Sequence, residues 1–234
     1  MENQTTSTTN PSQVLFIRHG QRADLHPEKE VEYDIPYDPP LTDTGFQQAK
    51  ETGEHLKEYI RNNKFDKIIL EVSPFLRTIQ TATEIAKALE LNDMKLNYHY
   101  REWLDASFYT QNPLEILNVR IMSKDEIQEK ISQGIDYNHE DIPHDIKDFF
   151  PENKSDCKKR TQNLIEKFKT QYQNHDERVL HLIVSHGFIV ESFAILNGGK
   201  QKFPEYCSIS GIEISGEDVN LLFDGNSDHV ITKY

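Results

Sequence analysis

Two histidine-glycine pairs follow apolar segments that lie far apart in the sequence. Residues 14–17 lead into Arg18-His19-Gly20, and residues 180–184 lead into Ser185-His186-Gly187. Apolar runs of this kind are typical of buried strands, and the glycine lets the backbone turn and approach a ligand closely. Because ligands of open α/β sheets gather at the carboxyl ends of the strands, we predict that both histidines face one site.

Other reactive side chains follow further predicted strands. Arg22 lies just after the first histidine, Arg77 starts the helix after a Ser73-Pro74 break, and Glu102 follows a third strand. Guanidinium groups bind phosphate oxygens in pairs and keep their charge at biological pH. A histidine can accept a phosphoryl group covalently, and a carboxylic acid can protonate the oxygen that departs. This set of residues therefore indicates phosphoryl transfer.

Strands and helices alternate along most of the chain, which predicts a three-layer α/β/α sandwich with a mostly parallel central sheet. We expect a disordered leader at 1–12 and one domain at 13–234, in which residues 104–154 form a capping insertion of loops and helical turns. A proline-rich loop at 21–41 is long enough to be functional. The expected strands are 14–17, 67–72, 95–98 and 178–184, with a hairpin at 208–214 and 219–223. One expected helix opens within 41–45, with Thr42 or Thr44 as its N-cap, and includes Ile60, and the others are 75–89, 156–172 and 188–196.

Composition restricts the partners of the 234-residue chain. Its 39 acidic and 26 basic residues give a formal net charge of −13, which repels nucleic acid and anionic membranes. Two cysteines, Cys157 and Cys207, are too few for a disulfide framework and fit a reducing compartment. The polar start of the chain has no signal-peptide pattern, and no apolar run is long enough for a membrane helix. We therefore predict a cytoplasmic protein.

Three motifs in order resemble the histidine phosphatase superfamily, which has the phosphoglycerate-mutase-like fold. They are Arg18-His19-Gly20, the Ser-Pro-x-x-Arg of 73–77, and Ser185-His186-Gly187, and the resemblance spans residues 13–230. Arg22, the segment 38–45 and Arg101-Glu102-Trp103 are similar to the eukaryotic branch that contains the suppressor of T-cell receptor signalling and ecdysteroid-phosphate phosphatases. The ubiquitin-associated and SH3 modules of the former are absent from this chain.

The resemblance implies a role for each matching residue. His19 would be the nucleophile that becomes phosphohistidine, and Glu102 would be the general acid and then the base. Arg18, Arg77 and His186 would hold the phosphoryl oxygens, with Arg22 at the mouth and Gly187 beside the substrate. No metal or cofactor is implied. The substrate would be a phosphorylated small molecule or phosphopeptide, and related domains pair often enough that a homodimer is compatible with the resemblance.

The proposed chemistry sets requirements on protonation. His19 must be neutral to attack, and nearby arginines should lower its pKa from the unperturbed value of about 6.5. Glu102 must carry a proton when the leaving group departs. We therefore predict optimal activity on the acid side of neutrality.

Several residues allow a second interpretation. Asp105 is a rival for the acid, and Arg22 could only pair with Asp24 or Asp38. The two site histidines could also be ordinary core residues. Aromatic residues could line a mouth, although packing within loops is the more common role; these residues are Tyr33, Tyr37, Trp103, Phe108 and Tyr109.

Three other motifs favour structural roles. His139 and His144 flank Pro143 in an acidic stretch, which favours a solvated loop over a metal site. The run Lys158-Lys159-Arg160 is typical of a solvated helix start. Both cysteines are interpreted as packing residues.

Two other functions are alternatives to a phosphatase. A phosphoglycerate mutase or sugar bisphosphatase would use the same fold, but such enzymes usually carry a small residue in place of Arg22. An inactive phosphate-binding scaffold would bind without turnover. The motifs do not identify the substrate, which could be protein phosphotyrosine, a steroid phosphate, a sugar phosphate or a nucleotide.

Overall fold

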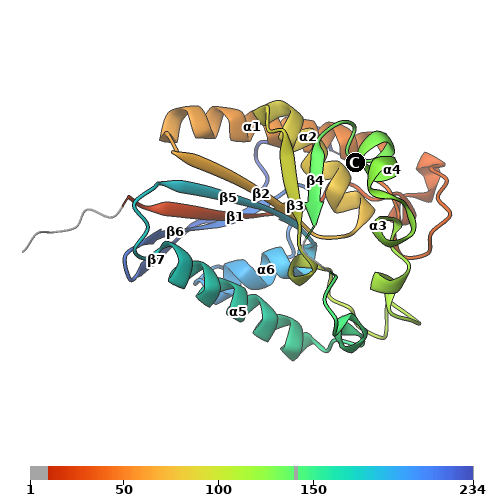
Figure 1. Cartoon of the computed structure of the whole chain (residues 1–234). Coiled ribbons are helices and arrows are strands. Elements are labelled where there is room, and N and C mark those ends of the chain that lie inside the picture. The colour runs from red at the N-terminus through yellow and green to blue at the C-terminus, as the bar shows by residue number, and fades with distance from the viewer. Residues whose placement is uncertain (1–9, 140–141, 234) are drawn as a thin grey trace, which may run out of the picture.

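The computed structural model describes residues 10–139 and 142–233 and contains a seven-stranded sheet with the order β4-β3-β2-β5-β1-β6-β7 (Figure 1). The five strands from β4 to β1 run parallel, β6 is antiparallel to β1, and β7 is antiparallel to β6. The strands are β1 (Ser12–Arg18), β2 (Lys67–Val72), β3 (Asp93–Leu96), β4 (Asp136–His139), β5 (Val179–Ser185), β6 (Ile209–Ser215) and β7 (Asp218–Asn226).

Helices cover both faces of the sheet, so the predicted three-layer sandwich is confirmed. Helices α1 (Asp43–Asn63) and α2 (Leu76–Leu89) lie on one face, and α5 (Lys154–Tyr172) and α6 (Gly187–Leu196) lie on the other (Figure 1). Helix α1 begins because the Thr42 side chain accepts a hydrogen bond from the backbone N–H of Gly45, as expected for an N-cap threonine.

The central strands are buried on both faces, which explains their continuous apolar sequences. All seven residues of β1 and of β5 are buried. One core cluster includes Leu15, Ile17 and Leu182, and the other centres on Phe16, which packs against the rings of Phe168 and Phe193. Alternate residues of the same strand therefore support the two helical layers.

The insertion at 104–154 differs from its prediction because it also extends the sheet. Strand β4 pairs in parallel with β3, with Met94 opposite Tyr137. The sequence of β4 is Asp-Tyr-Asn-His, in which Tyr137 is buried. It contains no apolar run, so the sequence shows no strand pattern there. The other elements are short: α3 (Asn118–Ile121), α4 (Lys124–Lys130) and 3-10 turns at Pro113–Glu115 and Ile146–Phe149.

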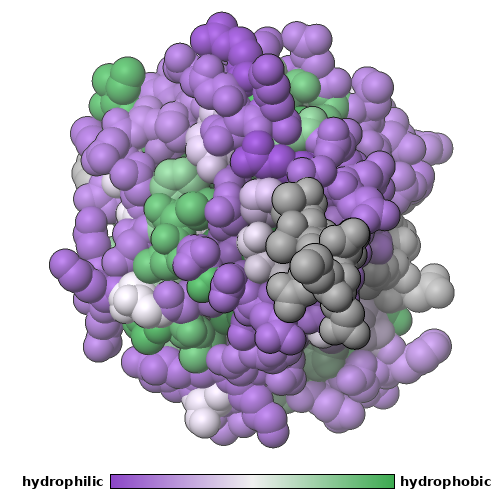
Figure 2. All heavy atoms as spheres, turned by 90° about the vertical axis from the view of Figure 1, so that its left-hand side faces the viewer, coloured by the Kyte–Doolittle hydropathy of each residue, from purple (hydrophilic) through white to green (hydrophobic). Residues whose placement is uncertain are grey.

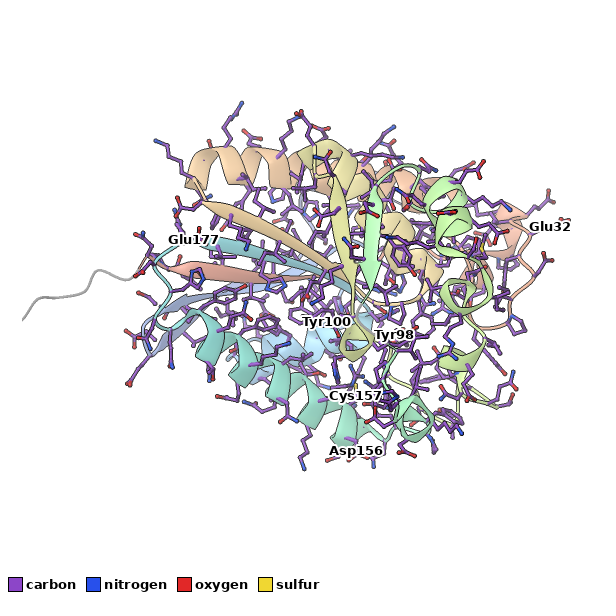
Figure 3. All side chains as sticks on the ribbon, in the orientation of Figure 1. Glu32, Tyr98, Tyr100, Asp156, Cys157 and Glu177 are labelled. Atoms are coloured by element: carbon purple, nitrogen blue, oxygen red, sulfur yellow. The ribbon has the colours of Figure 1, made fainter. Side chains whose placement is uncertain are left out.

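The loop at 21–41 is held to the body of the protein at its two ends. The backbone N–H of Ala23 donates to the carbonyl of Pro40, and that of Thr42 donates to the carbonyl of Gln21. Two 3-10 turns occupy Ala23–Leu25 and Pro27–Lys29. Figure 3 shows Glu32 on the outer edge of this loop, whereas Tyr98 and Tyr100 lie in the interior after β3.

The leader and the absence of a membrane helix were also predicted from the sequence. Most of the leader expected at 1–12 falls outside the described residues, and β1 already begins at Ser12. Within the described ranges, no helix is long and apolar enough to cross a membrane.

Candidate active site

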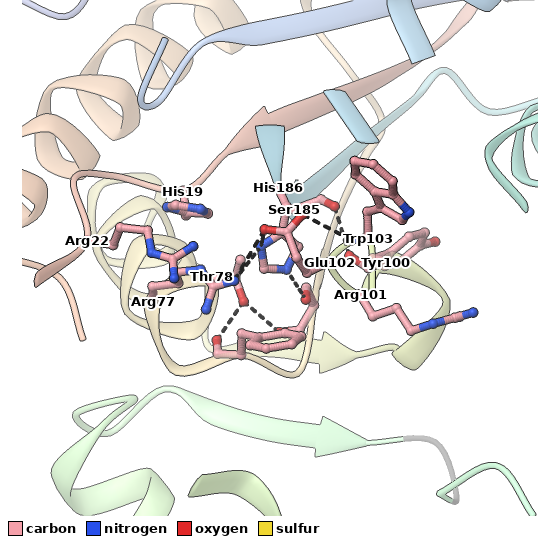
Figure 4. A network of polar contacts seen from close by, with 12 residues as sticks. His19, Arg22, Arg77, Thr78, Tyr100, Arg101, Glu102, Trp103, Ser185 and His186 are labelled. Carbon is pink, nitrogen blue, oxygen red and sulfur yellow. Dashed lines mark hydrogen bonds and ion pairs between the residues drawn. The ribbon is translucent and has the colours of Figure 1, made fainter. Parts of the chain in front are cut away.

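The parallel pairing of β1 and β5 brings the two His-Gly turns together. Arg18 lies opposite Ser185 in the sheet register, and the backbone N–H of His19 donates to the carbonyl of Ser185 at 3.0 Å. The rings of His19 and His186 consequently lie edge to face, with centroids 5.4 Å apart. Figure 4 shows both rings beside the side chains of Arg77 and Glu102.

His19 is held as a neutral imidazole with a defined tautomer. Its Nδ1 lies 2.7 Å from the carbonyl oxygen of Gly20, and since a carbonyl only accepts, Nδ1 carries the proton. The ring is buried, and this burial, together with Arg77 and Arg18, lowers the pKa of His19 well below its usual value. Nε2 is therefore left with the free electron pair.

Two glycines allow this turn to pack closely against helix α1. A Cβ on Gly20 would lie 2.5 Å from the carbonyl oxygen of Gly45, and one on Gly45 would lie 2.3 Å from the carbonyl oxygen of Gln21. The backbone N–H of Gly20 also donates to the hydroxyl of Thr81 on α2. Helices α1 and α2 thus fix the position of the His19 backbone.

Arg77 lies at the centre of the site and is completely buried. Its Nη2 is 3.1 Å from Nδ1 of His186 and 3.4 Å from Oε2 of Glu102, and its guanidinium stacks on the Phe75 ring. Among the residues that the structure describes, Nε and Nη1 of Arg77 have no hydrogen-bond partner. A buried cation with spare donors is a suitable partner for an anionic ligand.

Glu102 and His186 are in direct contact, and each affects the charge of the other. Oε2 of Glu102 lies 3.2 Å from Nδ1 of His186, and Oε1 accepts from the backbone N–H of Trp103. Burial opposes the charge of Glu102, but His186 and Arg77 outweigh it and hold the pKa of Glu102 well below its usual value. Burial lowers the pKa of His186 to about 4 despite Glu102, so the ring is neutral near pH 7.

Ser73 is a site residue to which the sequence assigned no role. Its hydroxyl lies 2.7 Å from Nε2 of His186, on the side of the ring opposite Glu102. A hydroxyl can donate or accept, so Ser73 can satisfy either tautomer of His186. The sequence placed Ser73 at the end of β2 but could not reveal its contact with His186, because the two residues are distant along the chain.

Arg18 is oriented by an aromatic pair. Its Nη1 donates to the carbonyl of Pro204 at 2.7 Å, and its guanidinium lies over the rings of Phe203 and Tyr206. A Cβ on Gly187 would lie 2.8 Å from Phe203 Cζ and 3.2 Å from Arg18 Nε. Glycine at the start of α6 therefore leaves the space in which this stack forms.

Arg22 both pairs with an acidic residue and lies at the mouth of the site, so the two interpretations of this residue hold together. It forms a two-pronged ion pair with Asp24, with both N···O distances 2.5 Å, and it also lines the cavity above His19. Burial opposes its charge, yet Asp24 raises the pKa of Arg22. The guanidinium therefore stays charged at the mouth of the site.

Asp38, the alternative partner for Arg22, and Asp105, the rival acid, both have structural contacts. Asp38 is fully buried and accepts hydrogen bonds from the backbone N–H groups of Leu76 and Asn118, so it joins the 21–41 loop to α2 and the insertion. Asp105 lies on the surface side of its loop and accepts from the backbone and hydroxyl of Ser107. The structure thus brings Glu102, rather than Asp105, into contact with Arg77 and His186.

Arg160 differs from its prediction as part of a solvated run. Its side chain is 9% exposed and makes an ion pair with Glu152 at 2.8 Å, while its nitrogens also donate to the carbonyls of His99, Arg101 and Glu102. Helix α5 therefore supports the loop that carries Glu102. The sequence could not reveal this role because all of these partners are distant along the chain.

A cavity of about 690 Å³ opens above His19, and its walls are aromatic. The aromatic mouth is therefore present, and its side chains also pack against one another, as Tyr37 does on Tyr109 and Trp103 does on Phe108. The lining residues include all five predicted aromatic residues: Tyr33, Tyr37, Trp103, Phe108 and Tyr109.

The donor set favours an anion over a metal ion. One ligand atom each from His19, Glu102 and His186 lies within 4.8 Å of the other two. However, the Arg77 guanidinium contacts Glu102 and His186 directly, so a divalent cation there would face an adjacent positive charge. His139 and His144, the other suspected ligands, flank residues 140–141, which lie outside the described residues. Both cysteines are buried, as expected of packing residues.

Comparison with known proteins identifies the family. The family model of the histidine phosphatase superfamily (branch 1) matches residues 14–223. The chain belongs to the histidine phosphatase superfamily. The prediction of a histidine phosphatase enzyme is therefore confirmed at the level of the family. A search of curated proteins found no match.

Solved structures share the fold of this histidine phosphatase over nearly its whole length. Phosphoglycerate mutase from Bacillus anthracis str. Sterne has a TM-score of 0.61 and 18% identity over 96% of this chain and 97% of that chain. A mutant phosphoserine phosphatase from Entamoeba histolytica, in complex with phosphoserine, has a TM-score of 0.56 and 18% identity over 94% and 100%. The ecdysone phosphate phosphatase of Bombix mori, in complex with tungstate, has a TM-score of 0.55 and 15% identity over 90% and 92%. The predicted phosphoglycerate-mutase-like fold is thereby confirmed.

Proposed function

We propose that this histidine phosphatase hydrolyses phosphomonoesters without a metal ion, through a phosphohistidine on His19. The observation that carries the proposal is the state of His19: a buried neutral ring whose Nδ1 donates to the Gly20 carbonyl. Its Nε2 electron pair is then available to a phosphorus atom, and Arg18, Arg22 and Arg77 supply positive charge around it.

The reaction has two steps. Nε2 of His19 attacks phosphorus, the ester P–O bond breaks, and Glu102 gives its proton to the departing alcohol oxygen. A water molecule then attacks the phosphohistidine, Glu102 takes a proton from it, and the P–N bond breaks to release inorganic phosphate. The proton that Glu102 takes from the water leaves with the phosphate product or passes to solvent, which returns Glu102 to the carboxylate form of the empty enzyme.

The remaining site residues stabilise charge on the phosphoryl oxygens. Arg77 is buried with two nitrogens that have no partner in the described part of the chain, and Arg18 and Arg22 line the cavity. His186 begins helix α6 as its N-cap, and Gly187 follows at the positive end of the helix. Since phosphoryl transfer depends mainly on positioning and electrostatics, these groups suffice for catalysis without a metal.

The decisive experiment replaces the nucleophile. His19→Ala should abolish phosphate release from 4-nitrophenyl phosphate and leave the melting temperature close to that of the wild type, because the ring serves chemistry. His175→Ala, which lies before β5 at the opposite end of that strand from His186, is the matched control and should retain full activity. Wild-type turnover rates in His19→Ala would refute the assignment.

The same assay separates the alternatives. Conversion of one phosphoglycerate isomer into another without free phosphate would identify a mutase. Tight binding of phosphate with no turnover of any ester would identify a scaffold. Activity that persists after treatment with a chelator is the expected result for a reaction without a metal.

The cell compartment and the oligomeric state are also part of the proposed function. Two buried free thiols are compatible with a reducing compartment, so we expect a cytoplasmic enzyme that acts on phosphorylated small molecules or phosphopeptides. A homodimer in solution would be detected by light scattering.

A further inference from the structure

The cavity above His19 is polar at its buried end and apolar towards solvent. The buried end contains His19, Arg18 and Glu102, whose exposed fractions are small. The apolar wall consists of Leu25, Tyr33, Pro36, Tyr37, Trp103, Phe108, Tyr109, Phe188 and Phe203. A phosphoryl group at the buried end would therefore leave the rest of its ester among apolar side chains.

Exposed apolar residues gather at this opening. Phe108 is 64% exposed, Phe203 is 61%, Leu25 is 58% and Tyr33 is 41%. These four are among nine large apolar residues in the described ranges that are strongly exposed, and all four line the one cavity. The face turned toward the viewer in Figure 2, at the amino ends of the strands, is mostly hydrophilic. Concentrated apolar exposure of this kind indicates a binding surface rather than scattered surface residues.

The charges that line the cavity disfavour a second anionic group. Arg22 is paired with Asp24, and Arg18 donates to the Pro204 carbonyl and stacks on aromatic rings. No lysine and no third arginine lines the cavity in the part of the chain that the structure describes. Asp24 and Glu102 add negative charge, so the cations that line the cavity in the described part of the chain are the two arginines, which already have partners, and they offer little to a carboxylate or second phosphate on the ester.

We propose that the substrates are phosphomonoesters of bulky, uncharged, apolar small molecules, such as phenols with fused rings. This inference rests on the proposed function. The cavity volume of about 690 Å³ is within the range of sites for small molecules of about 300–1,000 Å³. Burial of the leaving group against the aromatic wall would supply the binding energy that the single phosphate site lacks.

Matched substrates test the proposal on the intact enzyme. We expect kcat/KM for 2-naphthyl phosphate to exceed that for phenyl phosphate by about tenfold or more, because the second ring reaches the apolar wall. We expect 4-carboxyphenyl phosphate and 3-phosphoglycerate to be poorer substrates than phenyl phosphate, because each adds a carboxylate.

A wall variant and a control link the preference to this cavity. Phe108→Ala should raise KM for 2-naphthyl phosphate more than KM for phenyl phosphate, and the naphthyl-to-phenyl ratio of kcat/KM should fall towards one. Ile121→Ala removes an apolar side chain of similar exposure, 62%, that does not line the cavity, and it should leave the ratio unchanged.

Each outcome has a distinct meaning. A wild-type ratio near one, an unchanged ratio in Phe108→Ala, or higher kcat/KM for 3-phosphoglycerate or a phosphotyrosine peptide would overturn the inference while the proposed function stands. Failure to release phosphate from every ester would refute the proposed function itself.

Discussion

In the proposed reaction, the ionisation of Glu102 controls when the site can react. His186 and Arg77 lower the pKa of this carboxyl, so it is a carboxylate in the empty enzyme at neutral pH. The proton needed by the leaving group must then enter with the substrate, as the monoanion of the phosphate ester. Transfer of that proton to Glu102 in the bound state produces the acid that the first step requires.

This proton source predicts the pH dependence. The second ionisation of a phosphate monoester has a pKa of about 6, so kcat/KM should fall about tenfold per pH unit above that value. On the acid side, His19 stays neutral because its pKa is lowered, and activity should persist well below pH 6.5. Initial rates measured across the pH range test this, and a rate that still rises above pH 8 would contradict it.

Glu102→Gln tests the role of the carboxyl through the leaving group. Without the acid, an alkyl phosphate should lose about 10²–10⁴ in rate, whereas 4-nitrophenyl phosphate, whose leaving group needs little protonation, should phosphorylate His19 far more readily. Water attack then lacks a base, so a burst of nitrophenol with trapped phosphohistidine is expected. Equal losses for both esters would show that Glu102 is not the acid.

Ser73 is predicted to position His186. Ser73→Ala removes the partner of Nε2, and we expect kcat to fall by about 10–100-fold with a smaller change in KM, by analogy with outer partners that orient functional histidines. Ser192→Ala, at another buried serine whose hydroxyl has no partner in the described part of the chain, is the control and should keep wild-type activity. Ser73→Thr should recover part of the loss because it restores the hydroxyl. Without this recovery, the effect would be one of packing.

Among the elements, helix α5 holds the segment that carries Glu102. Arg160 joins the Glu152 carboxylate to three carbonyls of this segment, and Arg101 pairs with the same carboxylate at 3.2 Å. Burial opposes the charge of Glu152, but Arg160 and Arg101 outweigh it and lower the pKa of Glu152. The segment after β3 is therefore fixed by charge as well as by packing.

Removal of this support should weaken both fold and activity. Arg160→Ala leaves Glu152 with one cation and the carbonyls without a donor, so we expect a loss of about 3–5 kcal/mol in the free energy of unfolding. Urea denaturation measures the loss, and kcat should fall as well because Glu102 is less constrained. Lys159→Ala, at the exposed neighbouring position, should change neither quantity. A stability loss equal to that of Lys159→Ala would show that the ion pairs contribute little.

The whole molecule should be stabilised by a tetrahedral oxyanion. A ligand that binds only the folded state adds about 2.7 kcal/mol at a concentration of 100 Kd. For a chain of this size each kcal/mol raises the melting temperature by about 2–4 °C. Phosphate or tungstate should therefore raise the melting temperature by several degrees compared with chloride at equal ionic strength.

Arg77→Ala provides the control for this measurement. The variant lacks the buried guanidinium between His186 and Glu102, so the oxyanion should no longer raise its melting temperature. The comparison uses the shift within each variant, since the substitution can also change stability by itself. An equal shift in both proteins would indicate a general salt effect and no oxyanion site.

Short segments of the sequence determine most of the strands and helices and the motifs at the strand ends. Apolar runs identified β1, β2 and β5, helix periodicity identified α1, α2, α5 and α6, and the motifs at 18–20, 73–77 and 185–187 indicated which strand ends carry charged groups. These features depend on neighbouring residues, so the sequence contains them directly.

Only the tertiary structure decided the features that depend on distant partners. Strand β4 exists because β3 offers it an edge, and the Arg160 side chain is mostly covered because it meets Glu152 and the carbonyls after β3. The contact of Glu102 with His186 depends on long-range packing, as does the apolar wall, which is assembled from residues 25–37, residues 103–109, Phe188 and Phe203. Local periodicity cannot record such contacts, because their free energy arises between segments that meet only after the chain has folded.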